Sequence, residues 1–235
     1  MIATIPAPAS HPQALVWDGA NLRVAGGNIY GVDPETGTVL GQIPGPAGQV
    51  QDLAWDGASI WCVSYEPDRI HRLDPSSGSV LSLFATPGSS PVGLAWDGTD
   101  LWHSDNDGTF YRVDPSDGSV VSSAPSPFRA GTTMLDWDGE HLWASKLSDK
   151  IYQIDTSWHT LNTIHPPAAG PKGIAWDGKN LCNGGWQDDQ LCLLDATPAG
   201  ASFGELILSN TAPVTGKGVD SFRDLARPAV TRLIR

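Results

Sequence analysis

Short apolar segments alternate with turns rich in Gly, Pro and Asp along most of the chain. The word Trp-Asp-Gly falls at Trp17, Trp55, Trp96, Trp137 and Trp176, with spacings of 38, 41, 41 and 39 residues. No stretch shows the 3.6-residue period of an amphipathic helix. A fixed period near 40 residues is typical of repeat proteins, so the pattern predicts an array of small β-units.

The third repeat shows how one unit is built. Strands are predicted at 93–96, 101–104, 110–113 and 119–122. The first two flank Asp97-Gly98, a strong hairpin signal because glycine adopts the positive φ of a tight turn. The third ends at Asp114-Pro115, where the carboxylate can accept backbone N–H bonds and proline presets φ. Four antiparallel strands per repeat predict a β-propeller blade.

The two ends of the chain contain material for one more unit. Residues 1–8 precede the first Trp-Asp-Gly as a fourth strand would, and 217–222 resemble the start of a repeat. We therefore predict one domain over 1–235, an all-β, six-bladed β-propeller of four-stranded antiparallel blades, with the last blade closed by the N-terminal strand. Five blades with a trailing tail are the alternative.

The repeated tryptophans are expected to pack between blades, and each indole N–H needs a partner. They stand at one position of the first strand and, as Trp61, Trp102 and Trp143, at one position of the second. Across the next hairpin these three are expected to face His71, Tyr111 and Tyr152. The matching pair in the fifth repeat is Cys182 and Cys192, which predicts either a disulfide or two reduced, packed thiols.

Net charge arises mainly from the turns. Ten of the 26 acidic residues belong to the two repeated turns, which accounts for most of the charge of −12. The chain lacks a basic stripe that could replace the counterions of a nucleic acid, so we expect no nucleic-acid partner. No apolar run approaches the ~20 residues of a membrane helix, and the N-terminus lacks the features of a signal peptide. A cytoplasmic monomer without a membrane partner is expected.

The repeat Gly-x-Ala-Trp-Asp-Gly-x-x-Leu-Trp, followed by Ile-Tyr-x-Ile-Asp-Pro-x-x-Gly, resembles the bacterial propellers grouped with streptogramin (virginiamycin B) lyase. More loosely it is similar to the YncE-like and glutamine cyclotransferase propellers, although the Glu-Ser-Thr-Gly word of the latter is absent. The resemblance covers nearly the whole chain. It implies a propeller and, for the lyases, metal-assisted catalysis by His and Glu at one mouth of the ring; the nearest equivalents here are His103 and Asp105.

Candidate site residues lie where the repeat varies, because loops carry function on a repeated scaffold. One variable position precedes the first strand: Gln13, Gln51, Val92, Thr133, Lys172 and, in the tail, Lys217. Another ends the second strand: Gly26, Ser64, Asp105, Lys146 and Gly185. The three lysines predict a pocket for a carboxylate, phosphate or enolate, to which Arg129 contributes if it points inward. Solvated rim charges are the alternative interpretation.

His103 and Asp105 lie two apart on a predicted strand and therefore share a face. They could transfer protons or supply two ligands to a divalent ion, but no third ligand is evident, so we assign no metal site and no cofactor. A core histidine is the alternative. Trp186 and Tyr65 are expected to form an apolar wall at the same mouth.

These observations lead to two functional hypotheses. The first is a small-molecule enzyme, lyase- or isomerase-like, that acts at one mouth of the channel on an anionic or carbonyl-containing substrate. Its catalytic residues would be His103, Asp105 and Lys172, and its substrate-binding residues Lys146, Lys217, Trp186, Tyr65 and Arg129. The second is a non-catalytic propeller that binds a ligand or a protein at the same mouth.

Overall fold

The computed structural model describes residues 3–9, 12–127, 131, 133–146, 150–165, 171–185 and 190–195, with only the backbone at 3, 4, 133, 171, 172, 185, 190, 193 and 195. Its strands are β1 (Ala3–Pro6), β2 (Ala14–Trp17), β3 (Leu22–Gly26), β4 (Asn28–Val32), β5 (Val39–Pro44), β6 (Gln49–Trp55), β7 (Ile60–Tyr65), β8 (Arg69–Leu73), β9 (Val80–Ala85), β10 (Pro91–Trp96), β11 (Leu101–Asp105), β12 (Thr109–Val113), β13 (Val120–Pro125), β14 (Thr133–Trp137), β15 (Leu142–Lys146), β16 (Lys150–Ile154), β17 (Thr160–Ile164), β18 (Pro171–Trp176), β19 (Asn180–Gly185) and β20 (Gln190–Asp195).

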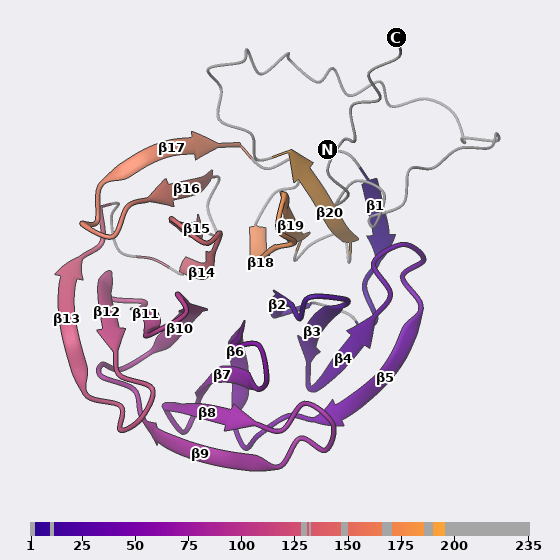
Figure 1. Cartoon of the computed structure of the whole chain (residues 1–235), viewed down its shortest axis with the longest axis horizontal. Helices are drawn as coiled ribbons and strands as arrows, with labels where there is room; N and C mark the ends of the chain where they lie inside the picture. Colours follow the sequence, from indigo (N-terminus) through magenta and orange to yellow (C-terminus); the bar gives the residue numbers. More distant parts are fainter. Residues whose placement is uncertain are drawn as a thin grey trace, which may run out of the picture.

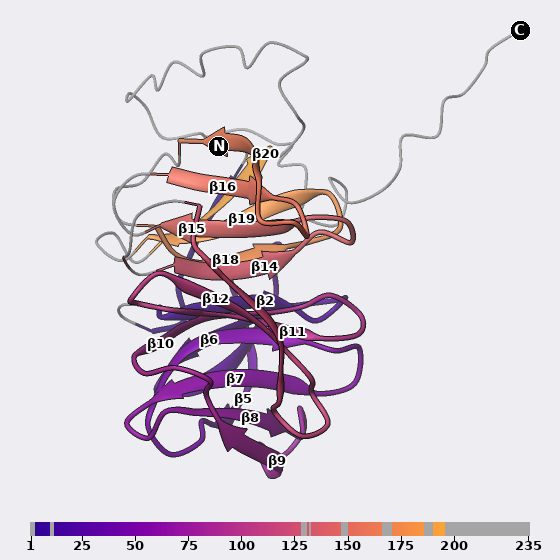
Figure 2. The ribbon, with the colours of Figure 1, turned by 90° about the vertical axis from the view of Figure 1, so that its left-hand side faces the viewer.

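These strands form five antiparallel sheets arranged as a ring, with β2, β6, β10, β14 and β18 innermost (Figure 1). Blades one to four are β2–β5, β6–β9, β10–β13 and β14–β17, each in sequence order, and blade five has the order β18-β19-β20-β1. The strands run across the thickness of the disc, so their connections emerge on two opposite faces (Figure 2). Among the described residues, no helix is long and apolar enough to cross a membrane.

The prediction of six blades is wrong, because the described chain forms five. The N-terminal strand does close a blade, but its partner is β20, with Ala3 opposite Leu193 and Pro6 opposite Gln190. The fifth repeat supplies three strands and β1 occupies its outer edge, so β1 is not available for a sixth sheet. The C-terminal segment assigned to the sixth blade, 217–222, lies outside the described residues.

The repeated Trp-Asp-Gly turn has the predicted geometry and a second role. The glycines after the aspartates, Gly19, Gly57, Gly98, Gly139 and Gly178, have φ between 93° and 101°. In the third blade Asp97 Oδ1 accepts the N–H groups of Thr99 and Asp100 at 2.8 and 2.7 Å, and Oδ2 accepts the indole N–H of Trp102 at 2.7 Å. The aspartate therefore fixes both the turn and the tryptophan on the strand that follows it.

The tryptophans pack between blades, as expected. Trp102 stacks on Trp137 of the next blade with 6.2 Å between ring centroids, and Trp143 stacks on Trp176 at 6.4 Å. Each such contact buries apolar rings within one inter-blade core cluster, which stabilises the ring as a whole.

The cross-strand register differs from the predicted one by one residue. Trp102 lies opposite Arg112, and it is His103 that faces Tyr111. In blade five Cys182 accordingly faces Leu193, and Cys192 faces Asn183. Because neighbouring positions on a strand point to opposite faces, the two thiols do not form a cross-strand pair. All three cysteines are reduced and buried.

Candidate functional site

The face of the ring opposite the Trp-Asp-Gly turns is built from the joints between blades and from the loops between the second and third strands, and these two kinds of connection contact each other. Residues 86–90 form the joint between blades two and three. The Ser90 carbonyl accepts the N–H of Asn106 at 3.0 Å, and the Thr86 N–H donates to the Asp68 carbonyl at 3.3 Å. We call this face the loop-side mouth. The joint thus ties the loops of two adjacent blades together.

A buried histidine–carboxylate pair lies beneath this joint. His103 Nε2 is 2.8 Å from Asp105 Oδ1, and neither side chain is exposed to solvent. His103 Nδ1 is 2.9 Å from the carbonyl oxygen of Gly93. Both residues project from the end of β11, where their spacing of two places them on one face.

The hydrogen bonds determine how many protons this pair holds. A carbonyl oxygen only accepts, so His103 Nδ1 carries a proton directed at Gly93. The Nε2–Oδ1 contact then needs one further proton, placed either on the imidazole or on the carboxyl group. In both arrangements the pair is neutral overall and shares one proton across a short distance. Such a pair can deliver or accept a proton with little rearrangement.

The second oxygen of the carboxyl group has no hydrogen-bond partner. Asp105 Oδ2 is buried and unpartnered within the described structure. A Cβ added to Gly88 would lie 1.6 Å from this oxygen and 3.0 Å from the hydroxyl of Tyr111. Burial and the nearby Asp105 raise the pKa of Tyr111. Glycine at position 88 is therefore required for the joint to approach Asp105, and the free oxygen faces the joint.

Blade five repeats part of this arrangement with different chemistry. Asn183 occupies the position of His103 and donates to the Gly173 carbonyl at 3.0 Å. The inner strand is irregular near both glycines, with register shifts between Pro91 and Gly93 and between Lys172 and Ile174. Such bulges re-aim backbone groups, so a side chain from the second strand satisfies each freed carbonyl. The histidine–carboxylate pair is specific to blade three.

A second acidic group fills the centre of the ring, and the sequence analysis did not identify it. Asp52 Oδ2 accepts the N–H groups of Leu94 and Leu135, each at 3.0 Å, and Oδ1 accepts that of Leu53 at 3.0 Å. One carboxyl group thereby joins the innermost strands of three blades. Burial raises the pKa of Asp52 well above its usual range despite these three bonds. Asp52 is fully buried.

Asp136 is a further buried acid on an inner strand. Its carboxyl group accepts the N–H of Trp176 from the neighbouring blade, and burial raises its pKa to about 7. The signal for both acids was present in the repeat alignment. Asp52 stands where the other blades have Ala14, Gly93, Met134 and Gly173, and Asp136 where they have Val16, Ala54, Ala95 and Ala175. An acid at an apolar core position marks a departure from the repeat.

Blade two contains a serine–histidine contact that is not arranged for nucleophilic attack. Ser64 Oγ lies 3.0 Å from His71 Nε2, but it donates its single proton to the Pro67 carbonyl at 2.9 Å. His71 Nε2 must therefore donate to Ser64 rather than accept from it. Burial and the nearby Arg69 lower the pKa of His71, in keeping with a neutral ring.

The other predicted site residues are placed only in part. Lys146 ends β15, half-buried, with Cε 3.3 Å from the point where a Gly131 Cβ would lie. Tyr65 ends β7 and is 37% exposed. Lys172 is described by its backbone alone, opposite Gly184. Arg129, Trp186 and Lys217 lie outside the described residues, so convergence of the lysines remains a prediction. Within the described part of the chain, no three His, Cys, Asp or Glu side chains gather as a metal site would require.

Comparison with known proteins identifies the fold. No family model and no curated protein sequence matches the chain. The structure is similar to that of Myxococcus xanthus glutaminyl cyclase, with a TM-score of 0.71, 15% sequence identity, and coverage of 83% of this chain and 95% of that one. It is also similar to a chain of a mitotic checkpoint complex, with a TM-score of 0.50, 18% identity, and coverage of 78% and 62%. At these identities the similarities confirm a β-propeller, and the first concerns a glutaminyl cyclase rather than a streptogramin lyase.

Proposed function

We propose that this protein is a small-molecule enzyme whose acid–base centre is the His103–Asp105 pair at the loop-side mouth. The observation that carries the proposal is the buried carboxyl group of Asp105, with one oxygen bonded to His103 and the other unpartnered. A buried polar atom without a partner is uncommon in native proteins and calls for an explanation. A substrate group that exchanges a proton with Asp105 Oδ2 supplies one.

This geometry suits proton transfer to and from carbon or a leaving group. His103 holds Asp105 in position and shares its proton, so the free oxygen can act as base and then as acid. The proposed substrate is a small anionic or carbonyl-containing molecule, and the reaction is of the lyase or isomerase type. Lys146 and Lys172 would bind the anionic group. The joint 86–90 covers the pair, so substrate entry requires this segment to move.

The similarity to a glutaminyl cyclase selects the first reaction to assay. Cyclisation of an N-terminal glutamine releases ammonia, which can be measured directly with a short glutaminyl peptide. A thermal-shift panel of organic acids, sugars, phosphates, aromatic metabolites and divalent cations with EDTA covers other substrates, since ligand at 100 times Kd adds roughly 2.7 kcal/mol of stability.

The decisive variants are Asp105→Asn and His103→Gln, compared with Asp107→Asn in the exposed turn of the same hairpin. For an enzyme, Asp105→Asn should lower kcat at least a hundredfold with the melting temperature retained, while Asp107→Asn should match the wild type. Full turnover in a folded Asp105→Asn protein would refute the assignment. If the wild type and the three variants all bind ligand without turnover, the second hypothesis, a non-catalytic binding propeller, is supported instead.

A further inference from the structure

A row of side chains across blade one departs from the same row in blades two, three and four. In blade two the row is Trp61, Arg72 and Ser82, in blade three Trp102, Arg112 and Ser122, and in blade four Trp143, Gln153 and Asn162. In blade one it is Arg23, Gly31 and Gly41. Residues opposite each other on adjacent strands share a face, so one face of blade one lacks a tryptophan and two further side chains.

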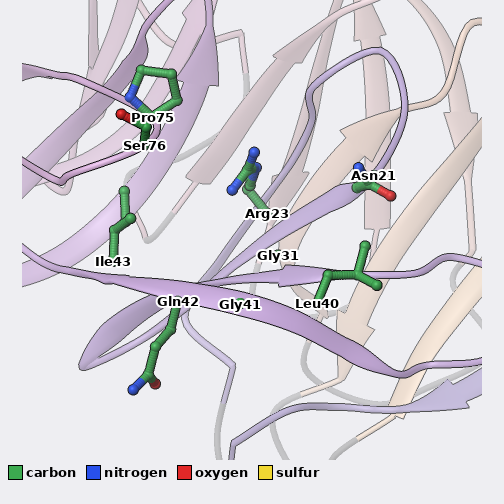
Figure 3. Close-up of a pocket in the computed structure, with 9 residues that line it drawn as sticks. All are labelled: Asn21, Arg23, Gly31, Leu40, Gly41, Gln42, Ile43, Pro75 and Ser76. Carbon is green, nitrogen blue, oxygen red and sulfur yellow. The ribbon is translucent and has the colours of Figure 1, made fainter.

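The missing side chains leave a pocket on the outer part of blade one. It has a volume of about 260 Å³ and is lined by Asn21, Arg23, Gly31, Leu40, Gly41, Gln42, Ile43, Pro75 and Ser76 (Figure 3). Ligand pockets for drug-sized molecules span roughly 300–1,000 Å³, so this one suits a smaller molecule. Arg23 and Ile43 project toward the Pro75–Ser76 turn of blade two, whereas Gln42 extends to the other side and bonds to Asn28 (Figure 3).

The corresponding space between other blades is filled by aromatic rings. Between blades two and three, Trp61 lies 6.1 Å from Phe84, and between blades three and four, Trp102 lies 4.7 Å from Trp158. Ile43 takes the place of Phe84 in blade one, and the facing turn of blade two has Gly78 where the turn of blade four has Trp158, both with φ above 70°. The space between blades one and two therefore lacks the rings that occupy these two neighbouring interfaces.

Arg23 holds a guanidinium group at the wall of this site. Its Nε donates to Asp18 Oδ2 at 2.6 Å, and in blades two, three and four a tryptophan indole makes the equivalent bond. The group lies over Gly31, with one terminal nitrogen 3.3 Å from the point where a Gly31 Cβ would be. In blades two and three, Arg72 and Arg112 lie 5.5 and 5.6 Å from the tryptophan ring centroids. Arg23 stands at the tryptophan position, and the open space beside it lets its guanidinium accept an aromatic guest on one face.

We propose that blade one binds a small planar aromatic molecule in this pocket, at a site separate from the loop-side mouth. The ring face stacks on the guanidinium of Arg23, and the ring edge contacts Ile43 and Pro75. Asn21 and Ser76 provide polar side chains at the margin of the pocket that select among ring substituents. The charge of Arg23 is balanced by Asp18, so a neutral ring is preferred to an anionic one.

The test uses indole as the probe, with benzoate as an anionic ring and cyclohexanol as a non-aromatic ring. Binding is followed from the backbone amide resonances of Gly31 and Gly41 in 15N-labelled protein. Indole should shift these two amides in a saturable manner, while benzoate and cyclohexanol should bind at least tenfold more weakly. The absence of saturable shifts with indole, or equal binding of cyclohexanol, would overturn the proposal.

Variants that fill the pocket provide the control. A Cβ at Gly41 would meet no atom within 4 Å and the residue has no positive φ, so Gly41→Phe fills the site without strain. It should weaken indole binding at least tenfold, whereas Ser122→Phe, the same substitution at the equivalent position of blade three, should not. Arg23→Trp restores the tryptophan of blades two to four, removes the guanidinium, and should likewise remove binding. If indole binds Gly41→Phe as it binds the wild type, the pocket is not the site.

Discussion

Asp52 should be among the residues on which the stability of the ring depends most. Its carboxyl group accepts backbone N–H groups of Leu53, Leu94 and Leu135, which belong to three different blades. The innermost strands have no further strand to pair with at the centre, so these donors depend on Asp52. Replacing Asp52 with alanine leaves all three donors without their acceptor in a fully buried position.

The expected loss can be estimated from the cost of a buried, unsatisfied donor. That cost is about 1–3 kcal/mol for each group, and water that enters the space left by the carboxyl group will satisfy part of it. The substitution Asp52→Ala should therefore lower the free energy of unfolding by about 3–6 kcal/mol. Domains of this kind are stable by only about 5–15 kcal/mol, so the effect is a large fraction of the total.

Urea unfolding followed by tryptophan fluorescence measures this change, because most tryptophans lie between blades. Asp52→Asn keeps one acceptor oxygen and resembles the protonated acid, so it should lose less than Asp52→Ala. Asp117→Ala is the control, since its carboxylate accepts one exposed N–H in a surface turn. An unfolding free energy for Asp52→Ala within about 1 kcal/mol of the wild type would show that the three bonds contribute little.

Three further predictions concern other groups. Burial raises the pKa of Asp136 from 3.8 to about 7, so the folded state favours the protonated carboxyl group. The stability that this group contributes is fully present below pH 4 and should decline as the pH rises to about 7, by at most about 4 kcal/mol. Asp136→Asn should flatten this pH dependence in unfolding measurements from pH 4 to 8. Trp102→Phe should lower the unfolding free energy by about 1–3 kcal/mol through loss of the bond to Asp97, measured against Phe110→Leu as a pure packing change. Cys62 and Cys182 should not react with a thiol reagent in the native protein, since burial raises both pKa values, but should react in urea; native labelling at a rate like that of free cysteine would contradict this burial.

The fold could be predicted from the sequence because its turns carry their own chemistry. Asp97 and Gly98 specify a hairpin locally, and five copies of that signal specify five blades. The predicted number of blades was wrong because of the chain ends, since residues 1–8 are predicted as a strand in both the five-bladed and the six-bladed ring. Whether this strand closes blade five or a sixth blade depends on its pairing with β20, a contact between the two ends of the described chain. A local pattern does not encode such a contact.

The candidate site residues are those that depart from the repeat. Sequence alone predicts a contact between them only where strand alternation already places their side chains on the same face. The contact between His103 and Asp105 could be predicted because a spacing of two on a strand places both side chains on one face. The role of Asp52 was not predicted, because its carboxyl group accepts backbone N–H groups of two other blades, from residues 42 and 83 positions away in the sequence. Arg23 escaped notice because its significance lies in what Gly31 and Gly41 leave empty beside it. Asp52 stands out in its own column of the repeat alignment, as an acid at an apolar position, whereas Arg23 stands out only when the whole cross-strand row is compared.

The same comparison explains why the ring tolerates these departures. In blade three the Asp97 carboxylate satisfies the indole of Trp102, and in blade one Arg23 takes over that bond to Asp18. In blade five Cys182 cannot replace it, and Asp177 Oδ2 is left buried without a partner in the described structure. The aspartate of the turn is therefore kept for its Oδ1 bonds, which Lys179 and Asn180 still make at 2.8 and 2.6 Å. Because the turn and the inter-blade packing use different oxygens of one carboxylate, a blade can lose its aromatic side chain and keep its hairpin, and this separation allows one blade to carry a pocket while the ring stays closed.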